Sequence, residues 1–129
     1  MMKHTCAVRF EPRVYVDTLT DGRGGIFNWV PEHAIKEFNF LFWNKGTERG
    51  DHYHPHFHEY MMLTSGEGVS ISGRGEEQTT IYMSRGTCIY VPRGVVHVFH
   101  AITDCTAVSF LSEEWDKSNP PIIHEEIVK

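Results

Sequence analysis

The chain has 129 residues, 40% of them hydrophobic and 22% charged, a composition that fits one ordinary globular domain and excludes a disordered or fibrous chain. Its formal net charge of −5 and isoelectric point near 6.0 argue against a nucleic-acid partner, because such proteins neutralise phosphates with a basic surface. A small-molecule ligand is compatible with this charge, since one or two arginines can hold an anionic group.

Short apolar runs rich in β-branched and aromatic residues, separated by glycine-rich turns, predict an all-β chain. The predicted strands, in chain order, are Thr5–Val16, Gly25–Val30, Glu37–Trp43, Gly50–His54, Glu59–Ser65, Gly68–Ser72, Gln78–Met83, Thr87–Val91, Val95–Ala101 and Cys105–Leu111. Helical propensity is confined to Glu32–Lys36 and Glu113–Lys117, each shorter than two turns. The turn at Gly73–Glu77 is expected to close a hairpin.

Histidine occupies every second position over residues 52–58, and Pro55 interrupts this run. We expect His52 and His54 to point inward from the end of one strand, and Glu59 to point inward from the start of the next. Two imidazoles and a carboxylate would then converge in the interior, which is a typical arrangement of metal ligands.

Two glycine-bounded stretches resemble the two sequence motifs of the cupin family. The first motif is matched by Gly46, His52, His54, Glu59 and Gly66. The second motif is matched by Gly86, Pro92, Arg93, Gly94 and His97. The asparagine that usually closes the second motif is Ala101 here, a departure that touches no expected ligand.

The resemblance implies a small antiparallel β-barrel, the double-stranded β-helix or jelly roll of cupins. It also implies that His52, His54, Glu59 and His97 bind one divalent metal ion. Imidazole and carboxylate ligands suit Zn, Fe, Ni, Mn or Co, and four protein ligands leave room on the ion for substrate or water. The expected organisation is one cupin domain over residues 1–129, with N-terminal strands in 1–45, the barrel in 46–111 and an extended tail in 112–129.

Residues 21–27 (Asp-Gly-Arg-Gly-Gly-Ile-Phe) and 49–54 (Arg-Gly-Asp-His-Tyr-His) resemble two signatures of the deoxysugar-nucleotide cupins. These are the dTDP-4-keto-6-deoxyglucose 3,5-epimerases and the related 3,4-ketoisomerases. The resemblance implies that Arg49 lies beside the substrate, that His52 is a proton-removing base, and that His54 matches a second histidine of the ketoisomerases. Those enzymes generally act without metal, and a His52 that binds a metal ion is not free to act as a base.

Together the resemblances predict a metal-dependent isomerase or epimerase that acts on a carbohydrate or nucleotide sugar. The ion would polarise a carbonyl while another residue moves the proton. The candidates for that residue are His56, His58, Tyr60, Tyr82 and Glu48. Besides Arg49, the residues expected to line the substrate pocket are Met61, Phe99, Tyr82 and either Phe40 or Phe42. Two alternatives stay open, a metal-dependent dioxygenase and a barrel that binds a small ligand without turnover.

Three features of the sequence indicate the protein's expected partners and cellular compartment. The segment 38–43 is apolar on both faces of a predicted strand, which favours a homodimer that covers one of them. The cysteines Cys6, Cys88 and Cys105 lack C-x-x-C spacing and are expected to be buried thiols of a cytoplasmic protein. No apolar run approaches the ~20 residues of a membrane span, so no membrane association is expected.

Overall fold

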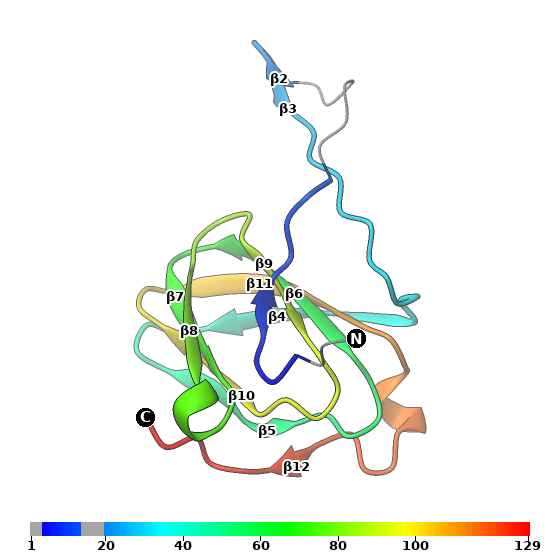
Figure 1. Ribbon diagram of the computed structural model, residues 1–129. Helices are drawn as coiled ribbons and strands as arrows, with labels where there is room; N and C mark the ends of the chain where they lie inside the picture. The colour runs from blue at the N-terminus through cyan, green and yellow to red at the C-terminus, as the bar shows by residue number, and fades with distance from the viewer. Residues whose placement is uncertain (1–3, 14–19) are drawn as a thin grey trace.

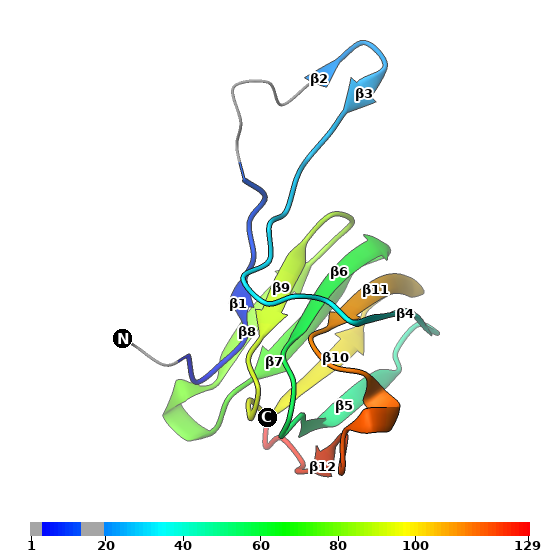
Figure 2. The same cartoon turned by 90° about the vertical axis from the view of Figure 1, so that its right-hand side faces the viewer.

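The computed structural model describes residues 4–13 and 20–129, and within them most residues of the central region lie in antiparallel strands. Two sheets face each other, and a short hairpin projects from them (Figures 1 and 2). The all-β prediction is therefore confirmed, with the two-sheet arrangement of a jelly roll.

The first sheet has the order β1-β9-β6-β11-β4 in the described part of the chain. Its strands are β1 (Val8–Arg9), β4 (Glu37–Trp43), β6 (Glu59–Ser65), β9 (Cys88–Val91) and β11 (Cys105–Leu111). The second sheet has the order β12-β5-β10-β7-β8. Its strands are β5 (Glu48–Tyr53), β7 (Gly68–Ser72), β8 (Thr79–Met83), β10 (His97–Ala101) and β12 (Ile123–His124).

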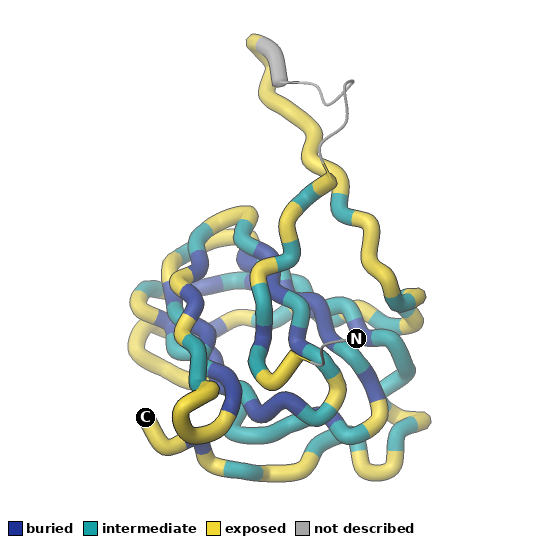
Figure 3. Tube along the Cα trace, viewed as in Figure 1, coloured by how far each residue is buried: buried dark blue, intermediate teal, exposed yellow. Residues whose placement is uncertain are grey.

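The main apolar core lies between these sheets, and strands such as β7 and β11 alternate buried inner residues with more exposed outer ones (Figure 3). It includes Trp43, Leu63, Met83, Phe99 and Ala107, which come from five different strands. On the outer side of the second sheet, a smaller cluster joins Val96 and Val98 to Ile127 of the C-terminal segment. The sequence from 37 to 111 thus forms strands close to those predicted.

The two predicted N-terminal strands are longer than the strands in the structure. Of the predicted strand Thr5–Val16, only Val8–Arg9 pairs with β9, Arg13 makes an isolated bridge to Asn28, and residues 14–16 lie outside the described part. Of Gly25–Val30, only β3 (Gly24–Gly25) is a strand, paired with β2 (Thr20–Asp21) in the projecting hairpin. These segments leave the two sheets, so they lack neighbouring strands with which to pair.

The two stretches with helical propensity form little helix, as expected for an all-β chain. Residues 32–33 form a bend and 34–36 have no regular structure, and the C-terminal segment has one 3-10 turn at Trp115–Lys117. A second 3-10 turn at Gly75–Glu77 closes the β7–β8 hairpin, as predicted for that turn. No helix in the described residues is long and apolar enough to cross a membrane.

The C-terminal tail was expected to be extended, and it also adds strand β12 to the edge of the second sheet. Ile123 pairs with Tyr53 and His124 with His52. Farther along, Ile127 is buried, and its backbone N–H donates to Oδ1 of Asp51 at 3.0 Å. We call residues 113–129 the C-terminal strap, because they cover the outside of β5.

Candidate metal centre

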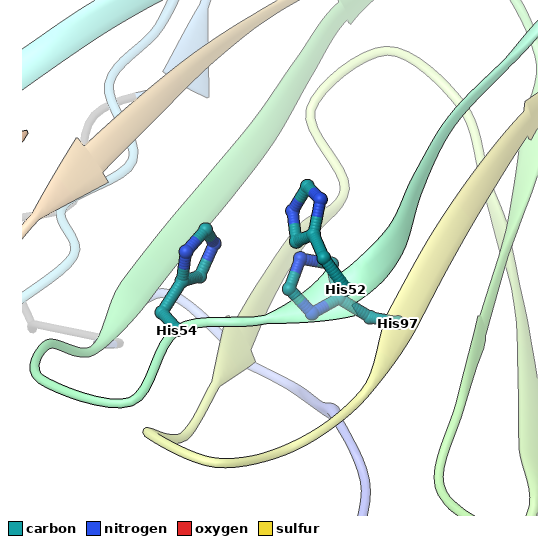
Figure 4. Close-up of side chains that lie close together, drawn as sticks. All are labelled: His52, His54 and His97. Atoms are coloured by element: carbon teal, nitrogen blue, oxygen red, sulfur yellow. The ribbon is translucent and has the colours of Figure 1, made fainter. Parts of the chain in front are cut away.

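Three histidines and a glutamate from neighbouring strands come together between the two sheets. His52 belongs to β5 and His54 follows it, while Glu59 opens β6 and His97 opens β10. Each imidazole offers a nitrogen within 4.8 Å of the others, and the three rings lie close together in Figure 4. Oε1 of Glu59 lies 3.1 Å from Nε2 of His54 and 3.5 Å from Nε2 of His97. The structure therefore brings the three predicted histidine ligands into one cluster and places Glu59 beside two of them, His54 and His97.

A β-bulge in β5 brings part of this cluster into place. Gly50 pairs with Val98 and His52 pairs with His97, so Asp51 is an extra residue in β5 relative to β10. Both bulge residues have positive φ, 130° at Gly50 and 58° at Asp51. The extra residue shifts the alternation of inner and outer side chains by one position along the strand.

The bulge allows Arg49 and His52 to face the same cavity. In a regular strand, residues three positions apart point to opposite faces. Here Arg49 pairs with Phe99 and His52 pairs with His97, and directly paired residues share a face. Phe99 and His97 both line the cavity between the sheets, and so do Arg49 and His52.

Hydrogen bonds from outside the cluster orient its imidazoles. Nδ1 of His54 lies 3.2 Å from the carbonyl of Pro121 in the C-terminal strap, and Nδ1 of His97 lies 2.9 Å from the carbonyl of Val95. A carbonyl only accepts, so each Nδ1 carries the hydrogen and donates it. The neutral form of either ring then directs the lone pair of Nε2 toward Glu59, as in many histidine metal sites.

The donor set fits a divalent cation. The lone pair of His54 Nε2 and Oε1 of Glu59 are both acceptors, and two acceptors 3.1 Å apart need a proton or a metal ion between them. The other carboxylate oxygen of Glu59 accepts a hydrogen bond from Ser109, which fixes the carboxylate. Nitrogen and oxygen donors of this kind suit the first-row metals named above.

The electrostatics hold these groups in the forms that bind metal. Burial alone would raise the pKa of Glu59, but the hydrogen bond with His54 and the nearby charges of His54 and His97 lower it to about 2. Burial, followed by the charges of His97 and His54, lowers the pKa of His52 to about 4. Burial also lowers the pKa of His97. At neutral pH the cluster therefore offers the Glu59 carboxylate and the neutral imidazoles of His52 and His97.

The cluster lines a cavity of about 390 Å³, within the usual size range of small-molecule sites. Its walls include Met61 and Phe99, as predicted, together with the inner residues of β4. Glu48 and Arg49 are exposed and line the same cavity, so they lie at its mouth. The other lining residues are Asn39, Leu41, Trp43, Gly50, Ser70, Ile89, Val91, Val98, Ser109, Leu111 and Trp115.

Comparison with known families identifies the chain. The sequence model of the family described as "Cupin domain" matches residues 40–112, which is more than half of the chain. The chain is a cupin. Comparison of this cupin with curated proteins found no match.

Solved structures that share this cupin's fold include sugar isomerases. A 3,4-ketoisomerase from Helicobacter canadensis is 14% identical, with a TM-score of 0.77 over 95% of this chain and 92% of that chain. QdtA, a sugar 3,4-ketoisomerase from Thermoanaerobacterium thermosaccharolyticum solved in complex with TDP, is 16% identical, with a TM-score of 0.74 over 96% of this chain and 90% of that chain. At these identities the similarity establishes a common fold.

The capsular polysaccharide assembling protein CapF from Staphylococcus aureus is also similar. It is 21% identical, with a TM-score of 0.66 over 85% of this cupin. The cupin spans only 32% of the CapF chain, so the match concerns one part of a larger protein.

The structure corrects the expected pocket residues on β4 and β8. Phe40 and Phe42 point outward, with 64% and 59% of each residue exposed, while Leu41 faces the cavity. The outer residues of β4 are as apolar as the inner ones, so the hydropathy pattern did not distinguish the two faces. Tyr82 lies on the outer side of β8, where its hydroxyl donates to Glu67.

The structure also places most candidates for proton transfer outside the cavity. Tyr60 points away from it, because it follows the inward Glu59, and packs between Phe10 and Tyr90. The His56 ring is exposed and contacts the backbone carbonyl of Asn119, since residues 55–56 form a bend between β5 and β6.

His58 joins a separate cluster outside the cavity, where its ring stacks on His33 at 3.9 Å and accepts from the Tyr90 hydroxyl. Among the proposed proton carriers, only Glu48 lines the cavity.

Most of the other cavity residues were missed in the sequence, among them Ser109, Asn39 and Trp115. Ser109 and Asn39 face each other across β11 and β4, and either could have been found from strand alternation once the inner face was known. Trp115 belongs to the C-terminal strap and packs on His54, with ring centroids 6.1 Å apart. No sequence pattern places that strap beside the motif histidines.

Proposed function

We propose that this cupin is a metal-dependent sugar isomerase that moves a carbonyl group between neighbouring carbons of a nucleotide-linked hexose. The observation that carries the proposal is the cavity in which Arg49 and the His52 cluster face the same space. The fold shared with two 3,4-ketoisomerases over nearly the whole chain supports the reaction class. Movement of a carbonyl requires proton removal from one carbon and proton return to the next.

The residues divide into three roles. His52, His54, Glu59 and His97 would hold the metal ion, and a bound divalent ion supplies Lewis acidity toward a substrate oxygen. The Arg49 guanidinium at the cavity mouth would bind the anionic diphosphate through charge-assisted hydrogen bonds. The strap and the indole of Trp115 would limit access of water to the cluster.

Of the proposed proton carriers, only Glu48 borders the cavity, although it pairs with His100 on the face of β5 opposite to the inward Arg49. It lines the cavity mouth beside Arg49, and its carboxylate is held by Lys129 at 2.7 Å and by His100 at 3.2 Å. The hydrogen bond from Lys129, more than any other influence, lowers the pKa of Glu48. The group is therefore a carboxylate at neutral pH, and its Oε1, which among the described residues accepts only from Lys129, keeps a lone pair that can accept a proton.

An exchange experiment tests this function. The metal-loaded protein is incubated in D2O with TDP-4-keto-6-deoxyglucose, the compound bound in a structure of a QdtA variant. We expect protein-dependent deuterium incorporation at the carbon next to the ketone, detected by NMR or mass spectrometry. Oxygen uptake without such exchange would instead support the dioxygenase, and binding without either change would support a non-catalytic barrel.

We also propose that the protein forms a homodimer through the outer face of β4. Phe38, Phe40 and Phe42 are 72%, 64% and 59% exposed on this face, which borders the partly exposed Phe110. Contiguous exposed aromatic rings of this kind favour association. Light scattering after size exclusion would test the proposal, and a Phe40→Ser variant is expected to shift the protein toward monomer.

A further inference from the structure

The inner face of β4 carries one side chain that the core does not explain. Asn39 lies between the inward Glu37 and Leu41, and it lines the cavity. Its carboxamide has no hydrogen-bond partner among residues 4–13 and 20–129. A leucine of similar volume would pack there without leaving polar atoms unsatisfied, so folding alone does not favour asparagine at this position.

The position of Asn39 relative to the candidate metal centre is defined by the strand register. Asn39 pairs directly with Ser109, so their side chains lie on the same inner face. The Ser109 hydroxyl donates to the Glu59 carboxylate. The carboxamide therefore lies next to the residue that fixes Glu59, while the imidazoles of His52 and His97 come from the opposite sheet.

A second polar group without a partner lines the cavity from the opposite sheet. Ser70 of β7 is only 2% exposed, yet its hydroxyl has no hydrogen-bond partner in the described part of the chain. It pairs with Phe99, whose ring lines the same cavity. The indole N–H of Trp43, another lining residue, is also buried and lacks a partner among the described residues. Buried polar groups in proteins usually have partners, so the buried Trp43 N–H and the Ser70 hydroxyl, at the same cavity as the half-buried Asn39, indicate a ligand.

The chemistry of these groups specifies what that ligand offers. A carboxamide and a hydroxyl each donate and accept, and a sugar hydroxyl does the same. A phosphate or carboxylate would need donors only, and an apolar ligand would need neither. The anionic part of a nucleotide sugar is matched instead by Arg49 at the cavity mouth.

We propose that Asn39 and Ser70 determine substrate specificity by hydrogen-bonding hydroxyl groups of a hexose ring held beside the His52 cluster. The inference rests on the proposed function, because it assigns the hydroxyl groups of that function's substrate. It adds that the sugar ring, rather than the nucleotide, occupies the cavity between the sheets.

Asn39→Leu provides the sharpest test, because a recognition role and a structural role predict opposite effects on stability. If the amide serves a ligand, the ligand-free variant has an unchanged or higher Tm. Calorimetry should then show five- to tenfold weaker binding of TDP-4-keto-6-deoxyglucose, an effect of about 1–1.4 kcal/mol, with unchanged binding of TDP. Ser70→Ala should act in the same direction, whereas Ser65→Ala, which removes an exposed hydroxyl bonded to Thr106, should not.

Each outcome decides the inference. A clearly lower Tm of Asn39→Leu, or equal affinity of the wild-type and variant proteins for the TDP sugar, overturns it. If the wild-type protein binds neither TDP nor the TDP sugar, the proposed function fails separately. The inference is then tested with free hexoses at millimolar concentration. It is supported if a hexose raises the Tm of the wild-type protein but not that of Asn39→Leu. It is overturned if the hexose raises the Tm of neither protein.

Discussion

Replacement of Gly50 by alanine should damage both the fold and the candidate metal centre. Gly50 has φ 130°, a conformation that L side chains rarely adopt. A Cβ atom there would lie 2.5 Å from the carbonyl oxygen of His97 and 2.6 Å from Cα of Val98. Both contacts are with backbone atoms, so no side-chain rotation relieves them, and β5 must move away from β10.

Gly46→Ala is a matched control that separates the two sources of strain. Gly46 also has positive φ, at 81°, but a methyl group added there would have no atom within 4 Å of it beyond its chain neighbours. Backbone strain alone should cost Gly46→Ala about 1–2 kcal/mol. Gly50→Ala adds the loss of about two ladder hydrogen bonds, at roughly 1 kcal/mol each, for a total of about 3–4 kcal/mol.

Urea denaturation of both variants measures these costs, and elemental analysis measures their metal content. We expect Gly50→Ala to lose metal as well as stability, because the bulge sets the direction of His52. Gly46→Ala should keep its metal. Equal destabilisation by the two substitutions, or full metal content in a folded Gly50→Ala protein, would refute the role assigned to the bulge.

His97→Ala should abolish metal binding and turnover together. Arg49→Ala should keep the metal and weaken nucleotide-sugar binding by roughly 1.5–3 kcal/mol. Elemental analysis and calorimetry on both variants distinguish these effects. Ile127→Ala should loosen the C-terminal strap and reduce metal affinity about tenfold, because His54 loses the Pro121 carbonyl; metal titration checks this. In the metal-free folded protein the pKa of His52 is about 4, against an ordinary 6.5. The unfolded chain therefore takes up the proton first, and the free energy of unfolding falls as the pH drops from 6.5 to 4. The loss of unfolding free energy should be roughly 1–2 kcal/mol after solvent screening of this partly exposed ring. Urea denaturation of the chelator-treated protein at each pH measures this loss, and His52→Gln should not show it.

The strands of the barrel could be predicted because their residues alternate against a common core. The bounds of β4, β6, β7 and β11 agree with the prediction, and turn glycines separate them. The face of β4 could not be predicted, since Phe40 on its outer side is more apolar than Asn39 on its inner side. Alternation gives the period of a strand, but hydropathy chooses its inner face only when the other face is polar.

The four metal-binding candidates were accessible from sequence because two separate motifs carry them. The joint placement of Arg49 and His52 was expected from resemblance, but its physical cause was not, because the bulge depends on the pairing of β5 with β10. The outward orientation of Tyr60 could have been predicted from the sequence. A residue next to the inward Glu59 in a regular strand must face outward, and this excludes it from the cavity.

The C-terminal strap has a practical consequence for protein production. Nζ of Lys129 lies 2.7 Å from the carboxylate of Glu48, which lines the cavity mouth. An oligohistidine tag fused directly after Lys129 would start next to Glu48, and its imidazoles bind the same metals as the His52 cluster. Metal content and substrate affinity are therefore best measured on protein purified with a removable N-terminal tag.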